Sequence, residues 1–239
     1  MGELLQAVKE NVEFLLLCLL IFLALFFVAM LVERKFLKTL KEVNKTRRMA
    51  YIAIFSVLAA VLMFFEVPLF FAPSFYEIDF SEVPVLISTF YLGPVAGVTT
   101  ELLKIVLKLL LKGTSTAFVG DFANFVIGCS FVLPASILYH TKKSKGTAIG
   151  GMALGTACMT VFGSAFNAFY LIPTYSTLFG MPLEAIVGMG TAVNSSINSV
   201  TTLVLFAVVP FNLLKGVLVS IITFLLYKRV EKLLVVREQ

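Results

Sequence analysis

The sequence predicts an all-α integral membrane protein. Apolar residues make up 59% of its 239 positions and charged residues only 14%, against about 25% in a typical soluble domain. The apolar residues form long continuous runs, and residues 14–32 contain no charge. Lipid offers no hydrogen bonds, so a backbone that crosses it must form helices or a closed barrel. Continuous rather than alternating apolar runs indicate helices.

Seven spans are expected, at residues 12–32, 49–71, 81–94, 96–112, 118–140, 148–172 and 210–228. The first is interpreted as a true span rather than a cleaved signal peptide, because the segment before it is not basic and its apolar run is longer than the usual h-region. The third is short, contains Pro84 and is closed by Gly93-Pro94, which is typical of a kinked or incomplete span.

Basic residues gather in three segments that these spans place on one side of the membrane. Fourteen of the 19 Lys and Arg lie in 33–48, in 141–147 and in the tail from Lys228, whereas loops 72–80 and 173–209 contain none. The positive-inside rule then places the C-terminus in the cytoplasm and the N-terminus outside, in a multi-pass protein of the cell membrane. The basic charge follows this topology, so no nucleic-acid partner is predicted.

The composition shift at 33–48 marks a subdivision. Residues 1–46 are expected to form an accessory N-terminal transmembrane helix with a basic cytoplasmic linker, and residues 47–239 a six-span membrane domain. Residues 183–209 are apolar enough for a further span, but polar residues between Asn194 and Thr202 interrupt them. A further crossing would also put the C-terminal basic cluster outside, so an external segment at the interface, or dipping back, is expected.

Polar side chains in the spans are costly and therefore point to function. Asn212 and Lys215 lie three positions apart on one face of the last span, as do Asp121 and Asn124 in another, and Asn167 lies one turn from an external helix end. These placements bring the asparagines and Lys215 to one level near the outer face, which predicts a pocket open to the outside. The alternative is structural: each amide bonds a neighbouring helix, or Lys215 pairs with Asp121.

The external loop 72–80 combines three aromatic residues, Phe75, Tyr76 and Phe80, with the carboxylates of Glu77 and Asp79. Such a loop could serve as a lid whose aromatic rings stack on a flat ligand. The alternative is an interfacial aromatic belt.

Further charges lie on one face of the fourth span, at Glu101, Lys104 and Lys108. They are expected to form an internal ion pair, with Lys108 and Lys112 extending toward the interface. His140, at a cytoplasmic helix end beside a basic loop, is expected to be solvated.

Groups for catalysis are scarce. The chain has one His, two Asp and no Cys–His cluster, and it lacks the metalloprotease, esterase and phosphate-loop motifs. The three cysteines fall in apolar runs, where small buried side chains are the ordinary reading. The sequence therefore predicts no enzyme, no cofactor, no metal site and no aligned carboxylates of a proton path. Uphill transport would need energy from partner proteins.

Four segments carry a resemblance to a known family: Asp79–Ile87 (DFSEVPVLI), Gly120–Gly128 (GDFANFVIG), Asn167–Pro173 (NAFYLIP) and Pro210–Gly216 (PFNLLKG). Together they make residues 47–230 resemble the substrate-specific (S) subunits of energy-coupling-factor (ECF) vitamin transporters, and within them the riboflavin-specific subunits. The resemblance implies a six-helix S-subunit bundle, here preceded by one extra transmembrane helix. It also implies tight capture of the vitamin from outside.

The resemblance further implies a site and partners. Asn167, Asn212 and Lys215 match the family's riboflavin-binding positions, beside the external loop with Tyr76, Asp79 and Phe80, and with Asp121 and Asn124 as further candidates. The family docks through its first helix, by a small-xxx-small pattern, onto a membrane coupling protein driven by two cytoplasmic ATPases. The nearest matches here are Ser56-xxx-Ala60 and Ala53-xxx-Val57.

Three alternatives to riboflavin capture stay open from the sequence. The chain could be an S subunit for another vitamin, such as thiamine or biotin. It could be a membrane enzyme acting on lipid-like substrates, which the scarcity of catalytic groups disfavours. It could also be an assembly protein, in which the common level of the polar residues would be accidental.

Overall fold

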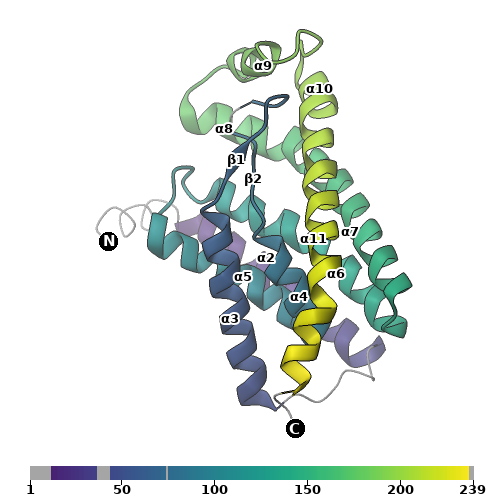
Figure 1. The fold of residues 1–239 in the computed structure, drawn as a ribbon. Coiled ribbons are helices and arrows are strands. Elements are labelled where there is room, and N and C mark those ends of the chain that lie inside the picture. The colour runs from purple at the N-terminus through teal and green to yellow at the C-terminus, as the bar shows by residue number, and fades with distance from the viewer. Residues whose placement is uncertain (1–11, 37–43, 74, 237–239) are drawn as a thin grey trace.

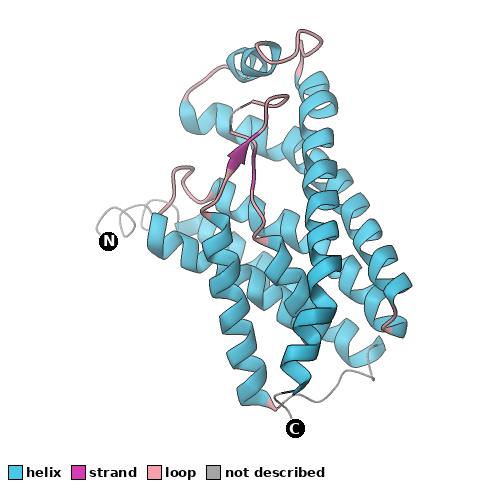
Figure 2. Cartoon of the chain, viewed as in Figure 1, coloured by secondary structure: helices cyan, strands magenta, loops and turns pink. Residues whose placement is uncertain are grey.

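The computed structural model describes residues 12–36, 44–73 and 75–236, and they form a helical bundle with one short hairpin (Figures 1 and 2). The main helices are α2 (Val12–Phe36), α3 (Lys45–Met63), α4 (Glu82–Leu92), α5 (Pro94–Lys112), α6 (Val119–Lys142), α7 (Lys145–Phe166) and α11 (Val209–Val236). The smaller elements are strands β1 (Val67–Pro68) and β2 (Glu77–Ile78), helices α8 (Ile172–Phe179), α9 (Leu183–Thr191) and α10 (Val200–Leu203), and π-helical turns η1 (Asn167–Leu171) and η2 (Val204–Val208).

Five continuous helical stretches are long and apolar enough to cross a membrane: Val12–Arg34, Lys45–Met63, Val119–Lys142, Lys145–Phe179 and Val200–Val230. The other two expected spans are α4, which has only 11 residues, and α5, which carries several charges. Gly93, with φ 100°, ends α4, and Pro94 begins α5 at once. The expected all-α, multi-pass architecture is confirmed.

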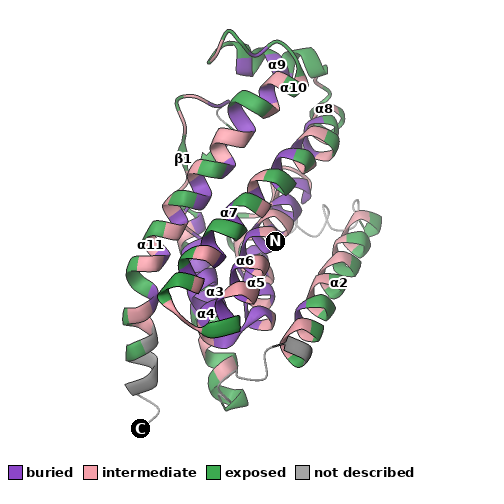
Figure 3. Cartoon of the chain, turned by 90° about the vertical axis from the view of Figure 1, so that its right-hand side faces the viewer, coloured by how far each residue is buried: buried purple, intermediate pink, exposed green. Residues whose placement is uncertain are grey.

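The core of the bundle surrounds the short helix α4, whose residues are almost all buried (Figure 3). α4 packs against α3, α5, α6 and α11. The largest apolar cluster includes Leu86 of α4, Phe131 and Tyr139 of α6, and Val219 of α11. Because α4 is enclosed on all sides, the polar groups at its first turn lie in the interior of the protein.

Helix α2 packs on the outside of this bundle (Figure 3). Phe14 makes an edge-on contact with Phe122 of α6, and Phe22 contacts Phe125 one turn along. At the other end of α2, Glu33 accepts hydrogen bonds from the Val95 backbone N–H and from Arg48. Residues 12–36 thus form one helix that packs on α5 and α6, and the basic residues of 37–43 lie outside the described residues. The division after residue 46 stays a prediction.

The expected span 49–71 is wrong beyond Met63, where α3 ends. Pro68 biases Val67 toward an extended conformation, and the two residues form strand β1. β1 pairs antiparallel with β2, with Val67 opposite Ile78 and Pro68 opposite Glu77. Residues 72–80, which were expected to form a loop, therefore form the second half of a hairpin that begins at residue 67.

The expected ends at residues 172 and 210 are also wrong, because both helices continue through a proline. The π turn η1 precedes Pro173 and the π turn η2 precedes Pro210. A proline lacks the N–H of the regular helical bond, and a π turn shifts the bonding pattern by one residue. The last helical stretch thus begins at Val200. Between the ends of the two long helical stretches, at Phe179 and Val200, only α9 and its flanking turns remain, and they lie beyond the hairpin (Figure 1).

Two glycines on α7 bring it close to α6, and alanine there should destabilise the fold. A Cβ at Gly151 would lie 2.6 Å from the Ala135 carbonyl oxygen, and one at Gly155 would lie 2.4 Å from that of Phe131. We expect Gly151→Ala and Gly155→Ala to lower the free energy of unfolding in detergent by about 1–3 kcal/mol, the usual cost of overpacking.

The matched control is Gly150→Ala, whose Cβ would meet only a Leu138 methyl group at 3.5 Å. Alanine favours a helix over glycine by up to about 1 kcal/mol, so this variant should unfold at or slightly above the wild-type temperature. Equal unfolding temperatures for Gly150→Ala and Gly151→Ala would contradict the close approach of α6 and α7.

Candidate functional site

A cavity of about 150 Å³ lies between the hairpin and helices α4, α6, α7 and α11. Five of the predicted site residues line it: Tyr76, Asn124, Asn167, Asn212 and Lys215. The other lining residues are Phe75, Glu77, Glu82, Gly120, Ala123, Ile127, Gly128, Met159, Leu171, Tyr175 and Phe211. The structure thus brings together polar groups from separate helices, and surrounds them with aromatic and aliphatic side chains.

Asn167 sits at the first position of the π turn η1, where the helix changes its bonding pattern. Its Nδ2 donates to the Gly163 carbonyl oxygen at 2.8 Å, and its Oδ1 accepts from the Tyr76 hydroxyl at 2.9 Å. Tyr76 belongs to the hairpin, so this contact ties the hairpin to the wall of the cavity.

Asn212 lies on α11, lines the same cavity and is 3% exposed. Its side chain packs against Gly163, where a Cβ would come within 3.1 Å of Nδ2. Among the described residues, nothing accepts a hydrogen bond from that Nδ2. A buried amide donor without a partner is costly, and it is suited to a carbonyl or ring nitrogen of a ligand.

Lys215, one turn further along α11, pairs with Asp79 rather than with Asp121. Its Nζ donates to Asp79 Oδ2 at 2.8 Å, and both residues are buried. Burial raises the pKa of Asp79, but the charges of Lys215 and Lys104 and the hydrogen bonds from Lys215 and Ser81 outweigh it, so the pKa falls to about 2. The alternative prediction, that Lys215 pairs with Asp121, is wrong. Asp121 instead accepts hydrogen bonds from Lys108 and Thr114.

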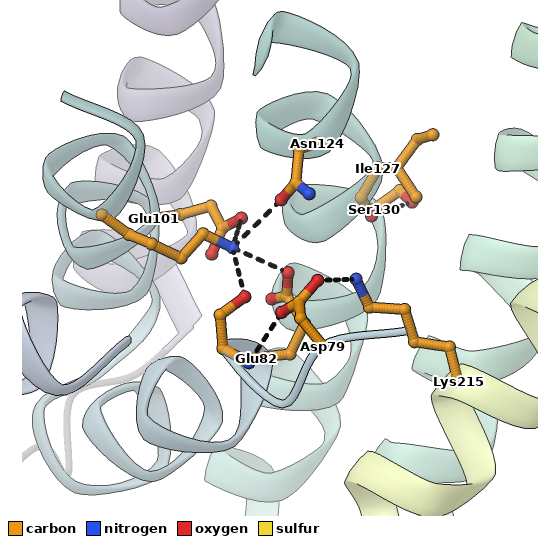
Figure 4. Close-up of polar contacts among 9 residues, drawn as sticks. Asp79, Glu82, Glu101, Asn124, Ile127, Ser130 and Lys215 are labelled. Atoms are coloured by element: carbon orange, nitrogen blue, oxygen red, sulfur yellow. Dashed lines mark hydrogen bonds and ion pairs between the residues drawn. The ribbon is translucent and has the colours of Figure 1, made fainter. Parts of the chain in front are cut away.

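A second ion cluster includes Glu82, Glu101 and Asn124, which Figure 4 shows close together. Its centre is Lys104, which is fully buried. Its Nζ donates to Glu101 Oε1 at 2.6 Å and to Glu82 Oε1 at 2.8 Å, which confirms the expected internal pair and adds a partner. Ser81 Oγ and Asn124 Oδ1 each lie 3.2 Å from the same Nζ. Asn124, a predicted ligand residue, is therefore also held by this cluster.

Three expectations about individual residues differ from the structure. Asp121 does not line the cavity but pairs with Lys108, whose Nζ also donates to the Gly113 carbonyl oxygen at the end of α5. Phe80 packs against the core of the bundle instead of lining the cavity. His140 is buried rather than solvated. Its Nδ1 lies 2.9 Å from the Ser136 carbonyl oxygen, one turn earlier on the same helix.

The sequence reading also missed residues that line the cavity. Glu82 is a carboxylate at the start of an apolar span. An ionisable side chain there is energetically costly, which should have marked Glu82 as a candidate. Tyr175 and Phe211 carry no comparable signal, because aromatic residues at helix ends commonly mark the membrane interface.

The four predicted docking residues lie on two different faces of α3. Ala53 and Val57 are exposed, in one stripe with Ile54 and Leu58. Ser56 and Ala60 are buried in the bundle, and the Ser56 hydroxyl donates to a carbonyl of its own helix. Of the four predicted docking residues, only Ala53 and Val57 therefore lie on the outward surface of α3.

The Lys215–Asp79 pair predicts the effect of removing its cation. Lys215→Met leaves the Asp79 carboxylate buried without its main partner, which typically costs about 3–5 kcal/mol of unfolding free energy. The double variant Lys215→Met/Asp79→Asn should recover most of the loss, since neither charge then remains. Unfolding of the ligand-free protein in detergent measures both.

Lys112→Met is the matched control, since the Lys112–Glu66 pair is 2.8 Å long but half-exposed at the lysine. Its removal should cost about 0–1 kcal/mol. A loss for Lys215→Met as small as that of the control would contradict a stabilising buried pair.

Comparisons with known proteins agree with this architecture. Residues 47–227 match the family described as ECF transporter, substrate-specific component. The riboflavin transporter RibU of Staphylococcus aureus is 35% identical over 193 residues, covering 81% of this chain and 95% of that protein. The riboflavin transporter FmnP of Bacillus subtilis is 31% identical over 189 residues, covering 78% of this chain and 93% of that protein.

A solved structure, reported as the structure and mechanism of the S component of a bacterial ECF transporter, superposes with a TM-score of 0.64. It is 35% identical and covers 80% of this chain and 99% of that chain. The family consists of transporter components rather than enzymes. The chain therefore belongs to the substrate-specific component family of ECF transporters.

Proposed function

We propose that this chain is the riboflavin-binding subunit of an ECF-type importer, which captures the vitamin from outside the cell. The observation that carries the proposal is the convergence of Asn167, Asn212 and Lys215 on one cavity. Relatives named riboflavin transporters, which match over most of the chain, favour riboflavin over thiamine or biotin.

The chemistry of the cavity suits a flavin. The isoalloxazine ring is flat, with alternating donors and acceptors on one edge, and amide side chains offer both kinds of group. The unpartnered Asn212 Nδ2 would donate to a ring acceptor, and Lys215 to a carbonyl or ribityl hydroxyl. Phe75, Tyr76 and Phe211 would cover the ring faces, and Phe75 and Phe211 already contact Tyr76.

Binding would require the hairpin to move. The cavity of about 150 Å³ is smaller than the roughly 300–1,000 Å³ of most small-molecule sites. Two of the proposed ligand groups are engaged by the hairpin segment: Asn167 by Tyr76, and Lys215 by Asp79. A flavin would therefore exchange these contacts for its own, with Tyr76 displaced to widen the site.

The proposed orientation places the hairpin and α9 outside and the C-terminus in the cytoplasm, with the N-terminus outside. The start of α3, with Lys45, Arg47 and Arg48, lies at the same end of the bundle as the end of α11 (Figure 1). The hairpin and α9 lie at the other end. Positive charge on the cytoplasmic side then agrees with the positive-inside rule.

The proposed partners are a transmembrane coupling protein and two cytoplasmic ATPases. The chain has no phosphate-loop motif of its own, so an importer needs its energy from elsewhere. The exposed stripe of α3 at Ala53 and Val57 is the proposed docking surface. Helix α2 packs on α5 and α6, which leaves this stripe uncovered.

Riboflavin binding is tested by quenching of flavin fluorescence with the purified full-length protein. We expect saturation at one flavin per chain, unaffected by excess thiamine or biotin. Asn167→Ala and Asn212→Ala should each weaken binding by about 10–100-fold, because each removes a buried hydrogen bond worth about 1–3 kcal/mol. Asn198→Ala, at an exposed amide outside the cavity, should bind as wild type.

No quenching by folded, ligand-free protein would refute the riboflavin assignment. Wild-type affinity in both cavity variants would remove Asn167 and Asn212 from the site while leaving the ligand in place.

Docking through α3 is tested by copurification with the coupling module. Ala53→Trp places a bulky ring on the exposed stripe, and we expect it to abolish copurification while flavin binding stays within about twofold, since Ala53 does not line the cavity. Leu20→Trp on α2 is the control, since Leu20 is 64% exposed on a helix away from the stripe. Equal copurification of both variants with wild type would exclude this face of α3.

A further inference from the structure

The carboxyl groups of Glu82 and Glu101 form a buried pair that the proposed transport function leaves unexplained. Glu82 begins α4 and Glu101 lies on α5, and they are 2% and 0% exposed. One oxygen of each lies within 3 Å of Lys104 Nζ, so the two carboxyl groups are close neighbours. Gly128 on α6 leaves them this space, since a Cβ there would lie 2.2 Å from Glu101 Oε1.

Lys104 provides a hydrogen bond to only one oxygen of each carboxyl group. Its ammonium has three protons and four acceptors around it, and the two Oε1 atoms are the closest. Glu82 Oε2 and Glu101 Oε2 are both buried and have no hydrogen-bond partner among the described residues. Two ionised carboxylates would leave two bare anionic oxygens in the interior of the bundle.

The charges of the cluster do not balance either. Lys104 and Lys215 supply two positive charges, whereas Asp79, Glu82 and Glu101 supply three carboxylates. An uncompensated charge in the membrane interior is strongly disfavoured, and a buried acid commonly neutralises instead. A metal ion is a poor candidate to supply the missing charge, because the Lys104 ammonium already occupies the point where the oxygens converge.

We propose that Glu82 and Glu101 are a proton-binding site, which at neutral pH holds one proton, taken from solvent, on the oxygens that do not face Lys104. The bound proton makes the cluster neutral and turns one bare oxygen into a hydrogen-bond donor. Sequence reasoning predicted no proton path, because Glu82 and Glu101 lie on different helices and only the fold brings them together. Glu82 also lines the cavity, so the proton is held beside the ligand site.

The groups that face this pair come from the loop before α4 and from helices α5, α6 and α11. Asp79 belongs to the loop before α4, Lys104 to α5, and Lys215 to α11. α6 contributes the Asn124 amide and the buried Cys129 thiol, which interacts electrostatically with both carboxyl groups. The charged residues in the described part of α3 all lie in its first turn, at the opposite end of that helix from the loop to α4.

Infrared spectroscopy of the full-length, ligand-free protein in detergent tests the site directly. A protonated carboxyl group has a C=O band separate from the carboxylate and amide bands, and the band shifts in heavy water. We expect such a band at neutral pH in wild type, and its loss in both Glu82→Gln and Glu101→Gln. Either amide makes the cluster neutral by itself, so the remaining carboxyl group ionises.

Glu184→Gln is the control, since Glu184 is exposed on α9, and it should keep the band. Labelling glutamate with a heavy carbon isotope in its side-chain carboxyl group assigns the wild-type band to Glu without any substitution, should a variant fail to fold. Absence of the band in wild type, or its survival in both variants, would overturn the proposal. Loss in only one variant would overturn the sharing of the proton. No ligand is used, so the result is independent of the riboflavin assignment.

Discussion

Placing charges inside a membrane protein requires that each one has a partner, and this requirement governs how the bundle is joined together. The Lys215–Asp79 pair connects α11 to the segment before α4, and Lys104 connects that segment to α4, α5 and α6. An unpaired charge at any of these positions would cost several kcal/mol. The ion pairs therefore fix the segment 79–82 against three helices, and with it the position of the hairpin that precedes Asp79.

The same pairs keep the polar groups of the cavity in place before any ligand arrives. Lys215 is held by Asp79, Asn124 by Lys104, and Asn167 by the Tyr76 hydroxyl and its own helix. Side chains held in this way lose less conformational entropy when a ligand binds. These contacts also select among ligands. A ligand can replace Tyr76 at Asn167 and Asp79 at Lys215 only if it offers equivalent hydrogen-bonding groups. In the proposed function this exchange favours a molecule with several donors and acceptors over a merely apolar one.

The sequence was sufficient to predict the main helices, though not all of their ends, and to predict that Asn167, Asn212 and Lys215 lie near one another, because apolar runs and helical spacing are local properties. It was insufficient where a contact between residues far apart in the sequence determines the structure. The partner of Lys215 lies 136 residues away in a loop, so no helical spacing could select Asp79 over Asp121. Pro173 and Pro210 predict helix ends by local rules, yet packing of the flanking segments sustains two π turns that let the helices continue. Glu82 and Glu101 become a pair only through the packing of α4 on α5.

The order of elements along the chain links the proposed docking surface to the cavity. Helix α3, which carries the exposed stripe, ends at Met63, and β1 begins at Val67, so the proposed docking helix leads directly into the hairpin. The hairpin carries Tyr76 to Asn167 and is followed at once by Asp79, the partner of Lys215. In the proposed importer, a coupling protein that pulls on α3 therefore acts on the segment that closes the cavity. This segment contacts the two helices that carry the proposed ligand residues, through Tyr76 and Asn167 and through Asp79 and Lys215.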